Sequence, residues 1–138
     1  MNITLMAQKR KTELLIQFCI AYRGILARHE LSATSATGKL IAEATGLAVH
    51  PYLSHNQGGP QQVSARITYN EVDLLLYFTD PTSPSDETLD RELLDLLRLC
   101  DHYSVPVATN LATAEMLILG LDRGDLDWRT LMHDRKRS

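Results

Sequence analysis

An almost continuous apolar run, Val72–Phe78, limits the fold of this chain more than any other part of its sequence. A short run of this kind is typical of a strand that is buried on both faces, and such strands occur in parallel sheets with helices on either side. The rest of the chain must therefore supply both the neighbouring strands and the helices that cover them.

Strand-sized apolar segments alternate with segments of helical periodicity along the chain. In residues 13–28, apolar side chains recur at spacings of three and four, as on one face of a helix. Strands are predicted at residues 2–7, 29–34, 47–53, 72–78 and 105–108, and helices at 13–28, through 40–44 up to Gly46, 60–67, 89–103, 111–121 and 126–132. This alternation predicts an α/β fold: a single-domain, three-layer α/β/α sandwich over residues 1–138 with a five-stranded, mostly parallel sheet.

Composition excludes several classes of function. The net charge of −3 provides no overall basic field for nucleic acid, and no stretch reaches the ~18 apolar residues that span a bilayer. Residues 1–7 are apolar but too short for a signal peptide. We therefore expect a cytoplasmic protein that binds neither nucleic acid nor a membrane. Cys19 and Cys100 have no metal-ligand spacing, and neither do the histidines, so we expect core thiols, no metal and no cofactor.

Polar loops follow the predicted strands at the place where a sheet of this type binds its ligand, outside the carboxyl ends of the strands. Residues 34–39 and 54–59 are rich in hydroxyl groups and glycine, and each segment leads into a predicted helix. The N–H groups at the start of a helix bind anions. Thr37 or Ser54 alone is explained equally well as a helix or turn cap. Two such loops side by side favour a pocket for a phosphorylated small molecule.

A longer set of segments resembles the methylglyoxal synthase family over nearly the whole chain. The matching residues are 33–34, 37–38, 43–47, 54, 58–59, 61–62, 80–81, 96–101, 106–115 and 123–129. The resemblance implies that family's fold, a homo-oligomer (a hexamer), and conversion of dihydroxyacetone phosphate to methylglyoxal and inorganic phosphate. The two polar loops together predict a phosphate site made of Thr34, Ser35, Thr37, Gly38, Ser54, His55, Gly58 and Gly59, and the resemblance adds Arg129 from a neighbouring subunit. In the family's pattern, glycine stands at the positions of Ser35 and His55.

The chain departs from the family's pattern at the positions of the catalytic and phosphate-binding residues. The reaction needs a base that takes a proton next to a carbonyl group, and the resemblance implies an aspartate for this role in a Gly-Gly-Asp-Gln segment. Here that position is Pro60, which has no ionisable group. The family's His-Asp pair after the first strand is Gln8-Lys9, and the phosphate-binding lysine is Thr12. The histidine that polarises the carbonyl group is replaced by the longer segment 84–87.

Three functions remain open at this point. The reading that we favour from the sequence is a catalytically impaired pseudoenzyme that binds a phosphorylated metabolite or nucleotide in a regulatory or sensing role. The first alternative is an active methylglyoxal synthase, a lyase, with relocated catalytic groups. Asp80 or Asp90 would then act as the base. The acid that the resemblance implies nearby is Asp90 or Glu92, depending on where the insertion of two residues falls. Lys9, Lys11 or His55 would supply positive charge. The second alternative is a structural subunit of a mixed oligomer.

Overall fold

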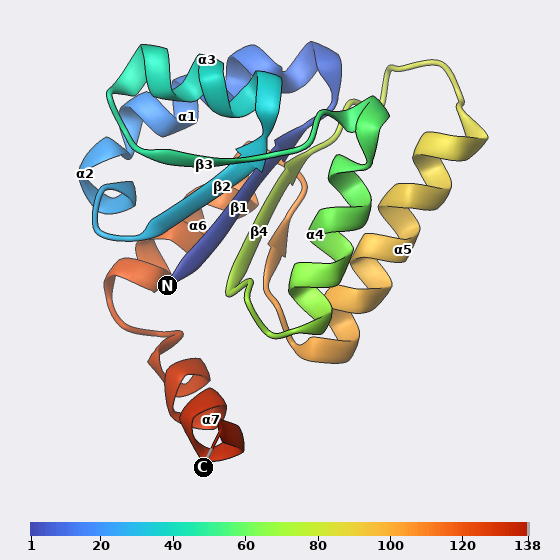
Figure 1. Ribbon diagram of the computed structural model, residues 1–138. Helices are drawn as coiled ribbons and strands as arrows, with labels where there is room; N and C mark the ends of the chain where they lie inside the picture. The colour runs from blue at the N-terminus through green and yellow to red at the C-terminus, as the bar shows by residue number, and fades with distance from the viewer. Residues whose placement is uncertain (138) are drawn as a thin grey trace.

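The computed structural model describes residues 1–137 and contains a five-stranded parallel sheet (Figure 1). The strands are β1 (Asn2–Ala7), β2 (Glu30–Thr34), β3 (Val49–Tyr52), β4 (Leu74–Phe78) and β5 (Val107–Ala108). Their order across the sheet is β3-β2-β1-β4-β5, and every pairing is parallel. In the centre, Leu5 lies opposite Ala33 on one side and Leu76 on the other. The predicted α/β fold with a five-stranded sheet is confirmed.

Helices cover both faces of this sheet (Figure 1). The helices are α1 (Thr12–Ala21), α2 (Arg23–Leu26), α3 (Ser35–Thr45), α4 (Gly59–Thr68), α5 (Glu87–Tyr103), α6 (Leu111–Asp122) and α7 (Asp127–Arg137), with short 3₁₀ turns η1 (Lys9–Lys11) and η2 (His55–Gln57). Core residues of α1, α2, α3 and α6 pack on one face, and those of α4 and α5 pack on the other. In Figure 1, α7 projects below the sheet.

The two cores explain the apolar run that dominates the sequence. In β4, Leu74, Leu76 and Phe78 point into the core formed with α1, α3 and α6, whereas Leu75 and Tyr77 point into the core formed with α4 and α5. Both faces of the strand are therefore buried, as the run predicted. The two thiols are small core residues, as expected: Cys19 lies in the first core and Cys100 in the second. Burial raises the pKa of each thiol to about 12.

Several predicted boundaries differ from the structure, each for a local reason. The predicted helix 13–28 is interrupted at Tyr22, whose backbone leaves the helical conformation with a φ of −108° and a ψ of 24°. Residues 35–38, expected in a loop, form the first turn of α3. Helix α5 begins two residues earlier than predicted because the Asp86 carboxylate accepts hydrogen bonds from the N–H groups of Thr88 and Leu89.

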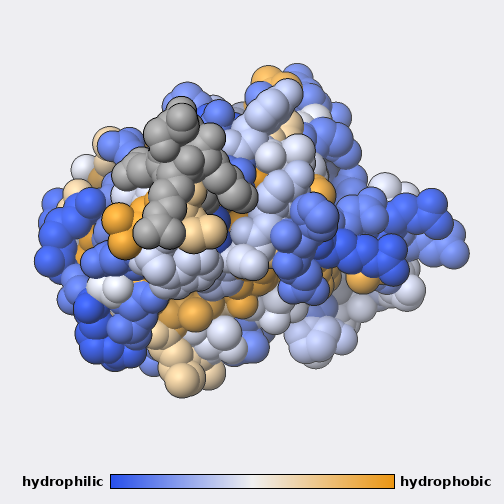
Figure 2. All heavy atoms as spheres, turned by 90° about the horizontal axis from the view of Figure 1, so that it is seen from below, coloured by the Kyte–Doolittle hydropathy of each residue, from blue (hydrophilic) through white to orange (hydrophobic). Residues whose placement is uncertain are grey.

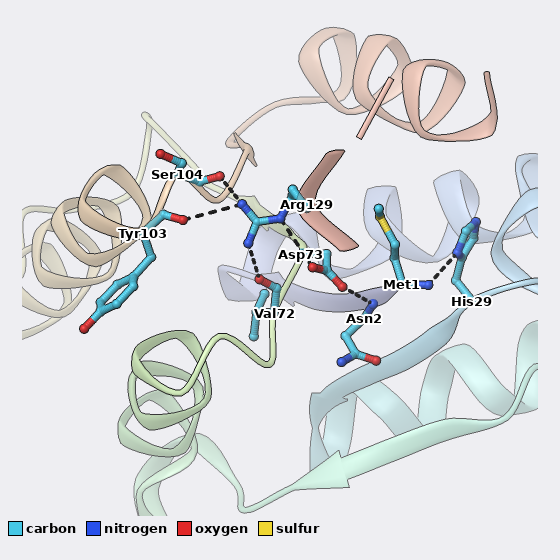
Figure 3. Close-up of polar contacts among 8 residues, drawn as sticks. All are labelled: Met1, Asn2, His29, Val72, Asp73, Tyr103, Ser104 and Arg129. Atoms are coloured by element: carbon cyan, nitrogen blue, oxygen red, sulfur yellow. Dashed lines mark hydrogen bonds and ion pairs between the residues drawn. The ribbon is translucent and has the colours of Figure 1, made fainter. Parts of the chain in front are cut away.

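A buried arginine fixes α7 at the amino edge of the sheet (Figure 3). Arg129 is 1% exposed, and its Nε lies 3.3 Å from Oδ1 of Asp73, just before β4. Its Nη2 donates to the carbonyl oxygen of Val72 at 3.2 Å. Its Nη1 donates to the carbonyl oxygens of Tyr103 and Ser104 at the end of α5. One side chain therefore ties α7 to the start of β4 and to the end of α5.

The surface on this side is mostly hydrophilic, with scattered hydrophobic patches (Figure 2). Helix α7 contributes exposed apolar side chains, among them Trp128, Leu131 and Met132. Within residues 1–137, every helix is too short or too polar to cross a membrane.

His29 makes the contact at the N-terminus depend on pH. The Met1 ammonium group lies 3.1 Å from Nδ1 of His29 (Figure 3). Burial, and then the positive charge of that ammonium group, lower the pKa of His29 below its usual value of 6.5. The unfolded chain therefore takes up this proton at a higher pH than the native chain does. We expect the free energy of unfolding to fall as the pH drops through about 6.5, the pKa of histidine in unfolded chains.

The measurement is urea unfolding of the wild type and of His29→Gln at several values between about pH 7.5 and pH 5. Glutamine cannot take up the proton, so the variant should lose less stability than the wild type over this range. Equal losses in the two proteins would show that another group causes the pH dependence.

Candidate functional site

A cavity of about 400 Å³ opens at the carboxyl edge of the sheet, where β1, β2 and β4 end. The chain runs from β1 to β2 on one side and reaches β4 on the other, so this edge is the point where the strand order reverses. Ligands of open α/β sheets bind at such points. The lining residues are Met6, Ala7, Gln8, Lys9, Thr12, Thr34, Ala36, Thr37, His55, Tyr77, Ser83 and Leu89.

The N-terminus of α3 forms one wall of this cavity. Thr34 occupies the N-cap position, and within residues 1–137 no side chain caps this end of the helix. The first N–H groups of α3 are therefore available to a ligand. The side chains of Thr34 and Thr37 line the cavity beside them, and Lys9 adds a positive charge from the segment after β1. Hydroxyl groups, N–H groups and a cation around one space suit a phosphate group.

Two glycines hold the loop after β3 against this wall. Gly58 adopts a φ of 102°, a left-handed conformation that favours glycine. A Cβ atom at Gly59 would lie 2.5 Å from the carbonyl oxygen of Leu53 and 3.0 Å from Cγ2 of Thr34. The loop is also fixed by the Leu53 N–H group, which donates to Oε1 of Gln62 at 2.6 Å. The close packing at Gly59 brings the 3₁₀ turn η2, and with it His55, to the mouth of the cavity.

An ionisable pair joins this loop to α5. Nε2 of His55 lies 3.3 Å from Oε2 of Glu92. The carboxylate also affects Tyr77, whose pKa is raised by burial and then by the negative charge of Glu92. Tyr77 lines the cavity. Its phenol therefore keeps its proton and can donate a hydrogen bond to an oxygen atom of a ligand.

Asp80 and Asp90 lie beside the main cavity rather than on its wall. Both line an adjoining hollow of about 290 Å³, and Asp90 is exposed there. Oδ1 of Asp80 accepts hydrogen bonds from the hydroxyl group of Thr82 at 2.6 Å and from its N–H group at 3.0 Å. These two bonds hold the pKa of Asp80 below its usual value. The Asp80 N–H group donates to Oε1 of Gln8, which links the two spaces.

The structure therefore brings together only part of the predicted phosphate site. Thr34, Thr37 and His55 line the same cavity, and Gly58 lines an adjoining one of about 520 Å³. The others support the loops rather than the cavity wall: Ser35 starts α3, Gly38 packs against Ala33 and Val49, Ser54 precedes η2, and Gly59 makes the close contact described above.

Arg129 lies at the opposite edge of the sheet, and its guanidinium group is bound within its own chain. Its role at a neighbouring subunit's phosphate site, and the homo-oligomer that this role requires, stay predictions. Pro60 is buried in the first turn of α4. The catalytic roles of Asp80 and Asp90 also stay predictions.

Sequence reasoning did not assign Tyr77 or Leu89 to the pocket. Tyr77 was part of the apolar run of β4, and nothing in that run separated a phenol at the ligand edge from a core aromatic. Its position next to the carboxyl end of a central strand was the one available signal. Gln8, Lys9 and Thr12 entered as departures from the family's pattern, and Lys9 also as a source of positive charge; all three line the cavity.

Comparison with known proteins identifies the family to which this chain belongs. Residues 15–109 match the MGS-like domain family. The methylglyoxal synthase of Caldicellulosiruptor saccharolyticus is 49% identical over 135 residues, which cover 98% of this chain and 94% of the relative. The chain belongs to the methylglyoxal synthase family. A second relative with the same name, from Geobacillus thermodenitrificans, is 49% identical over 138 residues, which cover 100% of this chain and 94% of the relative.

A solved structure of this family shares the fold. The crystal structure of methylglyoxal synthase from Elizabethkingia anophelis superposes with a TM-score of 0.74 and 33% sequence identity. The superposition covers 85% of this chain and 76% of that one.

Proposed function

We propose that this protein is an active methylglyoxal synthase that releases phosphate from dihydroxyacetone phosphate. The observation that carries this proposal is the identity of 49% to proteins named for that activity, along 98% of the chain. The comparisons give no support to the catalytically impaired, regulatory reading that the sequence favoured. Relatives this similar, together with a pocket at the ligand edge, support the enzyme instead.

The phosphate end of the substrate is assigned to the N-terminus of α3. The N–H groups of the first turn and the hydroxyl groups of Thr34 and Thr37 would donate hydrogen bonds to the phosphate oxygens. Lys9 would offset part of the phosphate charge. A cavity of about 400 Å³ is in the range of small-molecule sites. These donors stabilise phosphate both in the bound substrate and as the leaving group.

The other end of the substrate would face β4 and the loop after β3. The reaction removes a proton from the carbon next to the carbonyl group and forms an enediolate. The Tyr77 phenol, which stays protonated, is placed to donate a hydrogen bond to the oxygen atom on which negative charge develops. The remaining requirement is a base, which must be a group other than Pro60.

A direct assay tests the proposed function. Purified protein should form methylglyoxal and inorganic phosphate from dihydroxyacetone phosphate at a rate far above the uncatalysed one. Thr37→Val should raise KM about 10- to 100-fold, because a hydrogen bond to a charged group contributes about 1.5–3 kcal/mol. The matched control is Thr68→Val: this hydroxyl group is exposed on α4 and donates to the Ser64 carbonyl oxygen.

The two variants separate the outcomes of this assay. Thr68→Val should leave KM unchanged. A wild-type protein that forms no methylglyoxal would overturn the proposed function. An active wild type with equal KM values in both variants would keep the function but would remove Thr37 from the phosphate site.

A further inference from the structure

We propose that His55 is the general base of this pocket and that Glu92 positions it. This inference rests on the proposed function, since it names the group that takes the proton from the substrate. It assigns to the pair a role that Pro60 cannot fill.

The first support is the position of the imidazole ring. His55 lines the cavity that contains Thr34 and Thr37, and it also lines the adjoining cavity of about 520 Å³. Glu92 lines that adjoining cavity. The ring therefore lies at the boundary of the two spaces, with the carboxylate on one side and the candidate ligand space on the other. His55 and Glu92 come from different elements, η2 and α5, so the contact is a product of the fold.

The second support is the chemistry of the contact. Nε2 of His55 lies 3.3 Å from Oε2 of Glu92, an ion-pair distance, and this oxygen atom is buried without a hydrogen-bond partner among the described residues. A proton on Nε2 leaves Nδ1 of the neutral ring as the unprotonated nitrogen, which can accept a proton. A small rotation of the ring would let its N–H group donate to this oxygen atom. A carboxylate in that position fixes the tautomer of the ring and stabilises the imidazolium that forms during proton transfer. Histidine performs acid–base catalysis in this arrangement on unrelated folds.

The third support is the state of the other acidic groups. Asp80 is held by two hydrogen bonds from Thr82, which lower its pKa, and it lines the neighbouring hollow with Asp90. A carboxylate with a lowered pKa is a weaker base.

His55 shares the main cavity with the exposed amine of Lys9, from the segment after β1, and with the phenol of Tyr77, from β4.

Two carboxylates share the adjoining cavity with His55, namely Asp86 and Glu92, both from the α5 side. The charges around the ring are therefore two anions and one cation.

The proposed step conserves atoms and electrons. Nδ1 of His55 accepts the proton from the hydroxymethyl carbon, the C–H pair forms the C=C bond of the enediolate, and the carbonyl π pair moves onto oxygen. The O–H pair of the terminal hydroxyl group then forms the aldehyde C=O, and the C=C pair shifts towards the phosphate-bearing carbon. The C–O bond to phosphate breaks, and its electron pair and the hydroxyl proton leave with phosphate. The oxyanion pair then re-forms the ketone C=O while the C=C pair takes the proton of the imidazolium at the methylene carbon, which gives methylglyoxal and neutral His55.

The test is the pH profile of kcat/KM for the wild type, His55→Gln, Glu92→Gln and the control His102→Gln. His102 is exposed near the end of α5, away from the carboxyl edge. Loss of a general base should lower kcat/KM about 10²- to 10⁴-fold in His55→Gln, while the dissociation constant for inorganic phosphate, measured by titration calorimetry, stays within about threefold. His102→Gln should match the wild type.

Glu92→Gln provides a readout that a purely structural role would not move. Without the carboxylate, the imidazolium is less stable, so the acidic limb of the profile should shift to lower pH. The limb should be absent in His55→Gln. A variant His55→Gln that retains more than about a tenth of the activity with the same acidic limb would overturn the inference and leave the proposed function standing. If His55→Gln does not fold, an unshifted limb in Glu92→Gln would overturn it. An inactive wild type would overturn both proposals.

Discussion

Replacing Arg129 with methionine should lower the free energy of unfolding by about 3–5 kcal/mol, the largest stability effect that we expect from a single polar side chain in this protein. The variant keeps much of the side-chain volume but removes the guanidinium group. Asp73 would then remain buried, at 9% exposure, without its cationic partner. The carbonyl oxygens of Val72 and Ser104 would each lose a hydrogen bond. An unpaired buried charge costs far more than a lost surface contact.

Urea unfolding, followed by circular dichroism, measures this loss. The matched control is Arg28→Met, which breaks the ion pair between Nη2 of Arg28 and Oδ1 of Asp122 at 2.6 Å. The Arg28 side chain is 63% exposed, so its removal should change stability by less than about 1 kcal/mol. The double variant Arg129→Met with Asp73→Asn should recover part of the loss, because it no longer buries an unpaired charge. Similar stabilities for the Arg129 and Arg28 variants would contradict the described network.

Replacing Gly59 with alanine should lower the free energy of unfolding by about 1–3 kcal/mol and kcat/KM by about 100-fold. The new Cβ would lie 2.5 Å from the backbone oxygen of Leu53 and 3.0 Å from that of Ser54. Backbone atoms cannot move aside as a flexible side chain can, so the loop must shift as a unit. That shift would displace His55 from Glu92 and the pocket wall from Thr34. A factor of about 100 in kcat/KM corresponds to about 2.7 kcal/mol, so we expect the effects on activity and on stability to be of similar size.

Gly24→Ala is the control for this substitution. Gly24 lies in α2, and a Cβ atom there meets nothing within 4 Å among the described residues. Alanine at such a helical position should leave activity unchanged and should stabilise the fold by up to about 1 kcal/mol. Unfolding curves and the methylglyoxal assay on both variants provide the comparison. Wild-type activity in Gly59→Ala would show that the pocket does not depend on this close contact.

Most of the fold could be predicted because its signals are periodic. The buried run of β4 and the spacing of apolar residues in the helices each depend on many side chains, so single exceptions do not obscure them. The ends of the elements depend on single contacts instead. Helix α5 starts where the Asp86 carboxylate finds two N–H groups, and β5 is shortened because the Val105 N–H group bonds back to the Cys100 carbonyl oxygen at 2.8 Å. The ends of these elements are set by a few hydrogen bonds, and such bonds give only a weak signal in the sequence.

The site was predictable where it is built from local geometry. Thr34 ends β2, and Thr37 and His55 lie three residues beyond the ends of β2 and β3, so the pairing of these strands brings the three residues together. The pairing of His55 with Glu92 could not be foreseen, because it joins η2 to α5, and α5 starts after a loop that is longer than the family's pattern. The location of Arg129 also depends on tertiary packing. Sequence position near the C-terminus gave no sign that its guanidinium group is enclosed by its own chain.

The two outer strands of the sheet have a consequence for crowded solutions. Exposed strand edges can act as templates on which other chains add strands and grow into fibres. Here β5 is only two residues long, and β3 contains Pro51, which has no N–H group to offer to an arriving strand. Neither edge strand is therefore a good template for the addition of further strands. Copies of this protein should therefore meet through folded helical surfaces, and the native state has a built-in protection against fibrillar aggregation.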